Sequence, residues 1–294
     1  MIPVFPTANY HHAAATYDPR WLGRMNFPDP AIDSPTSQTL VNQMFDYYQD
    51  ALGARSRAFE YLEQHGINDL CLLKEMGVGF VDRTLGKQLP SGQSTEGASI
   101  RGNLQRLGLL VGSGGEFFRG ALVFPNKKAN GDITEAFGQR ITPRLRSGTP
   151  YQLYWSVTPA GFFNSSALTD NRKIILCQTP LDLLTLRCAG FNNVVSTLGT
   201  RNFGVEHLLA METTDVSEVC IAFDNTPEAN IAACLVAQVL SASDIACCRA
   251  TLPPGMSVNE CLVAYGAAML SSVILGAKTL VQTYERMQEN FRCD

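Results

Sequence analysis

The sequence has few charged residues and no paired cysteine motif. Charged residues make up 17% of the 294, and 23 lysines and arginines are outnumbered by 27 aspartates and glutamates. The net charge of −4 excludes a histone-like protein that binds polyanions over its whole surface. The nine cysteines form no Cys-x-x-Cys motif, and most lie in apolar runs. We therefore expect reduced thiols buried in a core and a cytoplasmic location.

The sequence also lacks the patterns of a secretion signal and of a membrane span. In the first twelve residues, MIPVFPTANYHH, no basic stretch precedes an apolar one, so no signal peptide is expected. The most apolar stretch, 262–280, is interrupted by two glycines and two serines and carries Lys278 near its end. This composition favours a buried helix, and we expect no membrane partner.

What is present indicates a folded protein of about two domains. Hydrophobic residues make up 45% of the chain, which excludes a disordered or collagen-like protein. A chain of this length buries enough surface to fold without a structural metal. Residues 1–40 are rich in Pro, Asn, Asp, Ser and Thr and predict an irregular arm. Within it, His11 and His12 are either a zinc-ligand pair or two solvated loop residues, and no cysteine lies near them.

The rest of the chain divides into two patterns, which together predict the α/β class. Residues 41–165 predict helices followed by a β-hairpin that turns at Asn130-Gly131, an α+β subdomain. From 166 to 261 strands and helices alternate, which indicates a mainly parallel sheet, and 262–294 form a C-terminal helical segment. The strands are expected at 173–176, 193–197, 219–223 and 245–250. Their carboxyl ends should converge on one rim, where open α/β sheets place their sites.

A local excess of basic residues lies within 90–150, where eight lysines and arginines face four acids. Six of the eight are arginines, whose planar fork suits phosphate. They are Arg101, Arg106, Arg119, Lys127, Lys128, Arg140, Arg144 and Arg146. This excess indicates a nucleic-acid-binding surface, although a solvated face on a hairpin accounts for it equally well.

Two groups of short motifs, many of them containing glycine, lie within about 40–265. The first comprises Tyr61-Leu62-x-x-x-Gly66-Ile67, Gly77-Val78-Gly79-Phe80, Phe118–Pro125 with Gly131, and Phe137-Gly138-x-Arg140. The second comprises Ile174–Asp182, Gly190-Phe191, Gly199-Thr200, Ile221–Asp224 and Leu252-Pro253-x-Gly255-Met256. The first group resembles the N-terminal subdomain of the bacterial DnaG-type primase catalytic core, and the second resembles the toprim domain that follows it. The closest pattern is that of the primase-like proteins carried by mobile elements.

The resemblance implies an enzyme that makes short RNA primers on single-stranded DNA, with Mg²⁺ or Mn²⁺ held by toprim carboxylates. The six acidic positions of the toprim domain in that family correspond here to Gln178, Asp182, Asp224, Thr226, Ser257 and Asn259. Four of the six are neutral, which leaves Asp182 and Asp224 as the metal ligands that the resemblance supplies. An amide or hydroxyl brings no charge to offset the dehydration of Mg²⁺, and Gln178 cannot act as a general base. Glu228 and Glu260 lie close in sequence and are expected at helix starts.

These substitutions predict a DnaG-primase-like protein that is catalytically inactive. It would bind single-stranded DNA or RNA, or act as a scaffold, as a subunit of a replication, mobile-element or defence complex. Arg119 and Arg140 occupy positions that the resemblance assigns to the template and nucleotide path. Residues 1–40 contain no cysteine, so the zinc-binding module of many primases is not expected and a protein partner would read the template. Two alternatives stay open: an active primase or other toprim phosphoryl-transfer enzyme with a rearranged metal site, and a protein-interaction module without a nucleic-acid role.

Overall fold

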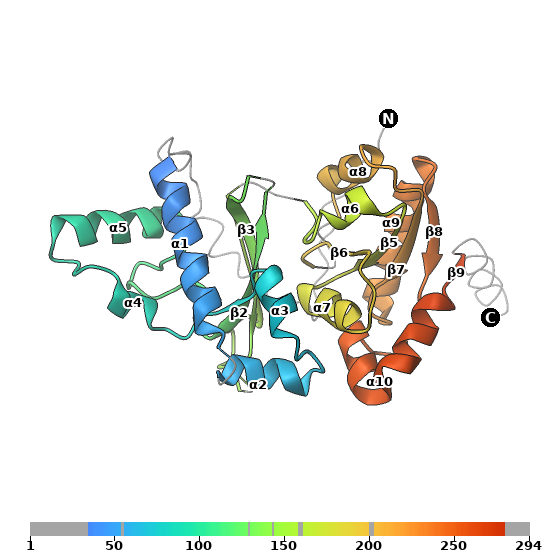
Figure 1. Cartoon of the computed structure of the whole chain (residues 1–294), viewed down its shortest axis with the longest axis horizontal. Coiled ribbons are helices and arrows are strands. Elements are labelled where there is room, and N and C mark those ends of the chain that lie inside the picture. The colour runs from blue at the N-terminus through green and yellow to red at the C-terminus, as the bar shows by residue number, and fades with distance from the viewer. Residues whose placement is uncertain are drawn as a thin grey trace.

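The structure is a computed structural model that describes residues 35–53, 56–128, 130–142, 144–157, 161–199 and 203–279. Most of the expected N-terminal arm, with His11 and His12, lies outside these residues. The last part of the expected arm is helical, because α1 (Pro35–Ala51) begins inside it. The first residue of this helix is a proline. Proline suits the first turn of a helix, where its missing N–H has no helical partner. The two subdomains lie side by side along the long axis of the molecule (Figure 1).

The N-terminal subdomain is a four-stranded antiparallel sheet with helices against it, and its strand order is β1-β2-β3-β4. The strands are β1 (Gly79–Phe80), β2 (Ala121–Lys127), β3 (Ile133–Arg140) and β4 (Gln152–Ser156). The further helices are α2 (Arg57–Gln64), α3 (Leu70–Glu75), α4 (Leu85–Gln88) and α5 (Thr95–Arg106). Phe45 and Tyr48 of α1 pack with Phe118 and Trp155 in one buried cluster that includes one face of this sheet. Gly79 permits the close approach of α1, since a Cβ there would lie 2.7 Å from the carbonyl carbon of Tyr48.

The second subdomain is a five-stranded sheet of order β6-β5-β7-β8-β9, in which the first four strands are parallel. Its strands are β5 (Lys173–Cys177), β6 (Val194–Ser196), β7 (Glu218–Ala222), β8 (Ala246–Arg249) and the antiparallel β9 (Lys278–Thr279). Its helices are α6 (Ala167–Asp170), α7 (Pro180–Cys188), α8 (Val205–Glu212), α9 (Pro227–Ala242) and α10 (Val258–Leu275). The expected class is confirmed, and the four expected strands lie within one residue of their predicted bounds.

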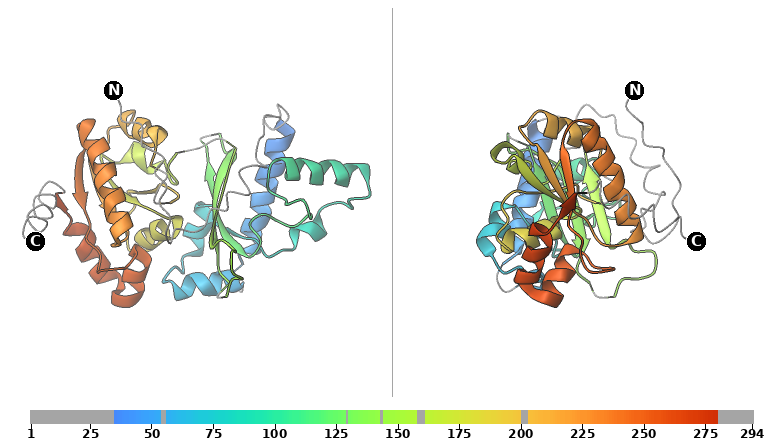
Figure 2. Two further views of the ribbon diagram at one scale, coloured as in Figure 1. Left: turned by 180° about the vertical axis from the view of Figure 1, so that it is seen from behind. Right: turned by 90° about the vertical axis from the view of Figure 1, so that its right-hand side faces the viewer.

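Helices cover both faces of this second sheet (Figure 2). On one face Val219 and Ile221 of β7 pack with Ala233 and Val236 of α9. On the other face α7 and α10 pack against the sheet and against the N-terminal subdomain, because Leu62, Phe124, Leu184 and Val258 share one cluster. The sheet is therefore buried on both sides, as a parallel sheet requires.

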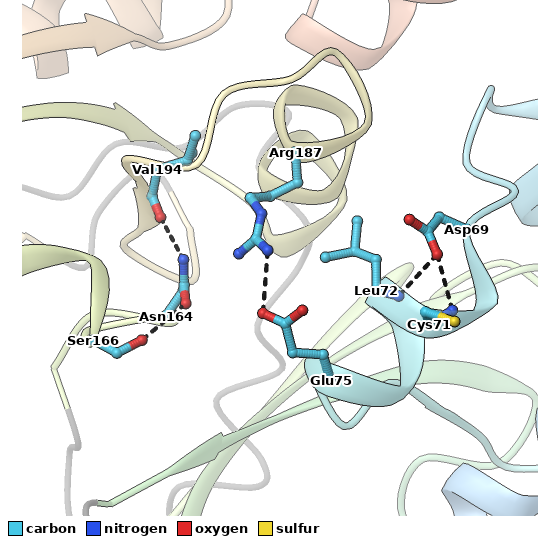
Figure 3. A network of polar contacts seen from close by, with 8 residues as sticks. All are labelled: Asp69, Cys71, Leu72, Glu75, Asn164, Ser166, Arg187 and Val194. Carbon is cyan, nitrogen blue, oxygen red and sulfur yellow. Dashed lines mark hydrogen bonds and ion pairs between the residues drawn. The ribbon is translucent and has the colours of Figure 1, made fainter. Parts of the chain in front are cut away.

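Polar contacts reinforce this junction between the subdomains (Figure 3). Arg187 of α7 forms an ion pair with Glu75 of α3, with an N–O distance of 3.1 Å. The side chain of Asn164 donates to the carbonyl of Val194 at 2.9 Å and so ties the connecting segment to β6. Asp69 caps α3 by accepting hydrogen bonds from the backbone N–H groups of Cys71 and Leu72. Of these contacts, the Arg187–Glu75 pair is the one that links α3 to α7.

The apolar stretch near the C-terminal end is not a buried helix, and the expectation of burial is wrong. In α10 the backbone departs from helical geometry at Gly266, where φ is 81°. Residues 263–269 are exposed, and in the second half of the helix Leu270 and Ile274 are buried. By length and composition α10 is the one helix among the described residues that could cross a membrane, a property that core helices of soluble proteins share. The exposed residues lie on both sides of the kink at Gly266.

Candidate functional site

The carboxyl ends of β5 and β7 meet at one rim of the second sheet, as expected. Gln178 follows β5 directly, and its Oε1 accepts a hydrogen bond of 2.9 Å from the backbone N–H of Asp224, two residues beyond β7. The Gln178 side chain is 2% exposed. Its Nε2 has no hydrogen-bond partner among the described residues. The amide thus joins two strand ends through its oxygen and leaves a buried donor unpaired, which costs stability.

The carboxylate of Asp182 is buried and already hydrogen-bonded on both oxygens. Asp182 lies in the first turn of α7, where Thr179 is the N-cap. Its Oδ1 accepts from the backbone N–H of Asn259 at 3.2 Å, and its Oδ2 accepts from the Thr179 hydroxyl at 2.6 Å. Burial raises the pKa of Asp182, although these hydrogen bonds lower it in part. The group is held by the two helix starts rather than pointed at solvent.

Asp224 is the more accessible of the two aspartates, and it too holds its proton more tightly than usual. Burial is the largest cause of its raised pKa, and the nearby carboxylates of Asp182 and Glu260 add to it. The guanidinium of Arg249 lowers the same pKa but does not cancel the rise. Three carboxyl groups therefore influence one another at this rim without a balancing set of cations.

Two of the four neutral positions are helix N-caps. The Thr226 hydroxyl accepts from the backbone N–H of Ala229 at 3.3 Å and begins α9. The Ser257 hydroxyl accepts from the N–H of Glu260 at 3.1 Å, and the Glu260 carboxylate accepts in return from the N–H of Ser257. This reciprocal capping box begins α10. Glu260, like Glu228 in the first turn of α9, lies at a helix start as predicted.

Asn259 ties the rim to the N-terminal subdomain. Its side chain is buried, and its Nδ2 donates to the carbonyl of His65 at 2.9 Å and to the Thr185 hydroxyl at 2.8 Å. His65 ends α2, whereas Thr185 belongs to α7. A carboxylate at this position has no hydrogen to donate to either group. The neutral side chain here makes a contact that the acidic residue of the resemblance cannot make.

The loop that carries Asp224 is anchored by Arg249, a residue that sequence reasoning missed. Arg249 lies on β8 and is 6% exposed. Its guanidinium donates to the carbonyls of Ile221, Phe223 and Asp224 and to Oδ1 of Asn230, at 2.8 to 3.0 Å. Burial lowers its pKa to about 10. The sequence did contain a signal for this role, namely an arginine inside an otherwise apolar strand. A charge in such a strand is buried only where hydrogen-bond partners compensate it.

This rim does not fit a divalent metal site of the expected kind. Mg²⁺ requires an octahedral set of oxygens and rarely gives up its water unless carboxylates compensate. Here each oxygen of Asp182 and the side-chain oxygen of Gln178 already accepts a hydrogen bond, and Gln178 brings no negative charge. Within the described part of the chain no group of three or more histidine, cysteine, aspartate or glutamate side chains has metal-binding geometry. We derive no chemical step from a metal here.

The predicted basic residues are not brought together into one surface. Arg119, Arg140, Arg144 and Arg146 lie at the end of the β2–β3 hairpin that is opposite its turn, or in the loop after β3. Lys127 and Lys128 lie at the turn, which is about 20 Å away along the seven-residue β2 at the usual rise per residue. Arg106 ends α5. Arg101 donates to the carbonyls of Gly86, Leu89 and Pro90 and holds the loop between α4 and α5.

At the end of the hairpin Arg140 is surrounded by other cations. It is 9% exposed and donates to the carbonyls of Pro150 and Arg119. Burial lowers its pKa, and the nearby positive charges of Arg119 and Arg83 lower it further. Arg83, which sequence reasoning missed, lies outside the basic stretch and reaches this end because β1 pairs with β2. Arg119, Arg144 and Arg146 are exposed, so this end presents positive charge to solvent.

A partly exposed tyrosine lies at the same end of the hairpin. The carbonyl of Tyr151 accepts from the backbone N–H of Arg140 at 2.9 Å, and Tyr151 is 42% exposed. Gln139 donates to the hydroxyls of both Tyr151 and Tyr61 at 3.1 Å. This pairing fixes the Tyr151 hydroxyl beside Gln139 and Tyr61 and leaves much of the residue open to solvent.

One family model and several solved structures resemble this chain. Residues 172–250 match the Toprim domain family. No curated protein sequence matches the chain. The primase of Aquifex aeolicus, with its zinc-binding and RNA polymerase domains, is 21% identical with a TM-score of 0.70, over 87% of this chain and 66% of that chain.

Two further solved structures cover similar shares of both chains. A DNA primase domain from Pseudomonas aeruginosa is 23% identical with a TM-score of 0.68, over 85% of this chain and 82% of that chain. A DnaG primase catalytic domain bound to ssDNA is 19% identical with a TM-score of 0.65, over 83% and 82%. The chain therefore has the fold of a bacterial DnaG-type primase catalytic core, and residues 172–250 within it match the Toprim domain family.

Proposed function

We propose that this protein is a non-catalytic, DnaG-primase-like subunit that binds single-stranded DNA or RNA in a replication, mobile-element or defence complex in the cytoplasm. The observation that carries the proposal is the use of the four neutral rim residues. Gln178 joins two strand ends, Thr226 and Ser257 cap helices, and Asn259 joins the subdomains. Each of these side chains has a structural contact in place of a metal ligand.

The nucleic-acid part of the proposal rests on the arginine end of the hairpin. Arg119, Arg144 and Arg146 are exposed there around the buried cation of Arg140. An arginine guanidinium can donate two parallel hydrogen bonds to one phosphate group. The exposed ring of Tyr151 offers a face on which a base can stack, an interaction that does not depend on sequence. A DnaG catalytic domain of this fold has been solved with ssDNA, which supports the same ligand class here.

The binding test compares two variants that each remove two positive charges. Arg119→Ala with Arg144→Ala changes the arginine end, and Lys127→Ala with Lys128→Ala changes the turn. Fluorescence anisotropy with a labelled single-stranded DNA measures affinity across a series of salt concentrations. We expect the arginine variant to bind about tenfold more weakly at low salt and its salt slope to fall by about 1.4, since each single-strand phosphate contact contributes about 0.7. The lysine variant should bind within about twofold of the parent protein.

Equal losses in both variants would show that net charge alone attracts the strand and would contradict the assigned surface. No retention by the parent protein would contradict a nucleic-acid role and favour the protein-interaction alternative. A pull-down with the full chain then identifies the companion subunit. Replacing Tyr151 with Ala separates stacking from charge, because it should weaken binding without changing the salt slope.

One observation favours an active enzyme as the second candidate. Glu260 lies close enough to Asp182 and Asp224 to raise the pKa of both, so a third carboxylate is available near the rim. The test is primer synthesis on single-stranded DNA with ribonucleotides and either Mg²⁺ or Mn²⁺. We expect no product. Primers that disappear on Asp224→Ala would replace the first candidate with this one.

A further inference from the structure

Cys220 and Cys248 lie opposite each other on neighbouring strands of the second sheet. β7 and β8 are parallel, and these two residues are paired in their register. Adjacent strands are about 4.8 Å apart, within the Cα separation of about 4.4 to 6.8 Å that a disulfide spans. Paired residues of neighbouring strands also direct their side chains to the same face of a sheet. The register thus places two thiols within reach of a covalent bond.

The shared face is the one that α10 covers. Val219, Ile221 and Cys247, the neighbours in sequence, pack in the cluster on the α9 side. Cys220 instead packs against the cluster that contains α7 and α10. Both Cys220 and Cys248 are partly exposed, whereas Cys177, Cys247 and Cys261 are buried. A small solute therefore reaches the pair more readily than it reaches the core thiols.

The two thiols differ in the direction of their pKa shifts, which suits them to different roles in a reactive dithiol. The neighbouring Cys220 thiol lowers the pKa of Cys248, and Lys173 lowers it further, although burial and Glu218 act in the opposite direction. The pKa of Cys220 is raised by Cys248, by burial and by Glu218, and Arg249 lowers it only in part. The lowered pKa of Cys248 favours it as the attacking thiolate and Cys220 as the thiol that resolves the product, because the thiolate is the nucleophile.

We propose that Cys220 and Cys248 form a dithiol site that a peroxide oxidises to a reversible disulfide. The Cys248 thiolate attacks one peroxide oxygen, the O–O bond breaks, and one water leaves after protonation, giving a sulfenic acid on Cys248. The Cys220 thiol then attacks that sulfur, the S–S bond forms, the S–O bond breaks, and a second water leaves. The two sulfurs lose two electrons, which the peroxide gains. An added dithiol reductant reverses the step by exchange.

This bond would join β7, one of the two strands that end at the rim, to its neighbour β8. β7 leads to Asp224, and Arg249, next to Cys248, holds the Asp224 loop through its carbonyl groups. The inference does not rest on the proposed function, since it needs neither nucleic acid nor catalysis.

The test treats the full-length protein with a small molar excess of hydrogen peroxide, then blocks free thiols and digests without reduction. Cleavage after glutamate, lysine and arginine separates 219–228, which holds Cys220, from 229–249, which holds Cys234, Cys247 and Cys248. We expect the two peptides to be linked, lighter than their sum by two hydrogen atoms, with fragment ions that place the bond at Cys248. Linkage to Cys234 or Cys247, or oxidation confined to Cys71 and Cys188, would overturn the proposal.

Two variants sharpen this result. Cys247→Ser should leave the linked peptide unchanged. Cys220→Ser should abolish it and leave a sulfenic acid on Cys248 that dimedone traps, whereas trapping elsewhere in that variant would contradict the assigned roles. Melting curves before and after treatment show whether each variant is folded, and the peptide map of the parent protein decides the question without any variant.

Discussion

The two subdomains place polar side chains beyond their strand ends in opposite ways. At the rim of the second sheet, Gln178, Asp182 and Asn259 are buried, and their side chains bond backbone and hydroxyl groups, with Nε2 of Gln178 as the exception among the described residues. At the end of the β2–β3 hairpin, Arg119 and Arg144 are exposed. At the rim most side-chain polar atoms are therefore paired inside the fold, whereas at the hairpin end the charged groups of Arg119 and Arg144 face solvent.

The largest expected difference is in stability, between two arginine-to-methionine variants, one in each region. Arg249→Met removes four hydrogen bonds and leaves buried carbonyls unpaired, so we expect a loss of about 3 to 5 kcal/mol in the free energy of unfolding. Arg119→Met changes an exposed side chain and should stay within about 0.5 kcal/mol. Urea denaturation measures both. Similar losses would mean that Arg249 does not anchor the Asp224 loop.

Introducing an aspartate at the rim should cost stability at a position that joins the subdomains and have little effect at a helix N-cap. Asn259→Asp removes the donor to His65 and Thr185 and sets a second carboxylate beside Asp182, which we expect to cost about 2 to 4 kcal/mol. Thr226→Asp keeps an acceptor at a helix N-cap and should change stability by less than about 0.5 kcal/mol. Denaturation of the two variants checks this. If Mg²⁺ restored Asn259→Asp to the parent stability, the rim would still be a metal site.

The pH dependence of stability should differ between the parent protein and Asp224→Asn. The pKa of Asp224 is raised to about 7, whereas an unfolded aspartate titrates near 3.9. The folded state therefore binds this proton more tightly, and the stability that the proton provides is complete below about pH 4 and is lost as the pH rises through 7.

Asp224→Asn keeps a neutral group at every pH, so it should stabilise the protein by about 1 to 3 kcal/mol at pH 8 and have little effect at pH 4. Thermal unfolding at both values measures the difference. An equal effect at the two values would show that Asp224 titrates normally.

The smallest expected effect concerns two serine caps, one in each subdomain. Ser257 caps α10 and Ser94 caps α5, and each accepts from a backbone N–H three residues on. Replacing either with Ala should cost about 1 kcal/mol. The two losses should be alike and insensitive to Mg²⁺, as thermal unfolding would show. A loss at Ser257 that depended on Mg²⁺ would contradict its role as a simple cap.

Strand positions could be predicted from the sequence because each strand is a short apolar run between helix caps and glycines. Lys173–Cys177 is one such run, followed by the cap at Thr179. From these positions the meeting of Gln178 with Asp224 followed, since parallel strands end at one rim. The identity of that rim's hydrogen-bond partners did not follow. His65 is 194 positions from Asn259, and no local pattern links them.

Two expectations failed or were incomplete because they depended on surface geometry. The apolar stretch 262–280 predicted burial, but much of α10 is exposed on both sides of the kink at Gly266. The basic excess in 90–150 counted residues that lie at opposite ends of one hairpin, and it left out Arg83, which strand pairing brings to the arginine end. Composition records how many apolar or charged residues a segment has, whereas exposure depends on what packs against them.

The sequence by itself determined the α/β class and the order of the strands along the chain, because these depend on residue type and local spacing. Tertiary structure alone decided that Asn259 joins two subdomains, that Arg249 holds the Asp224 loop and that Cys220 meets Cys248. Such contacts form between distant parts of the chain, and their partners are fixed only when the strands have paired and the helices have packed.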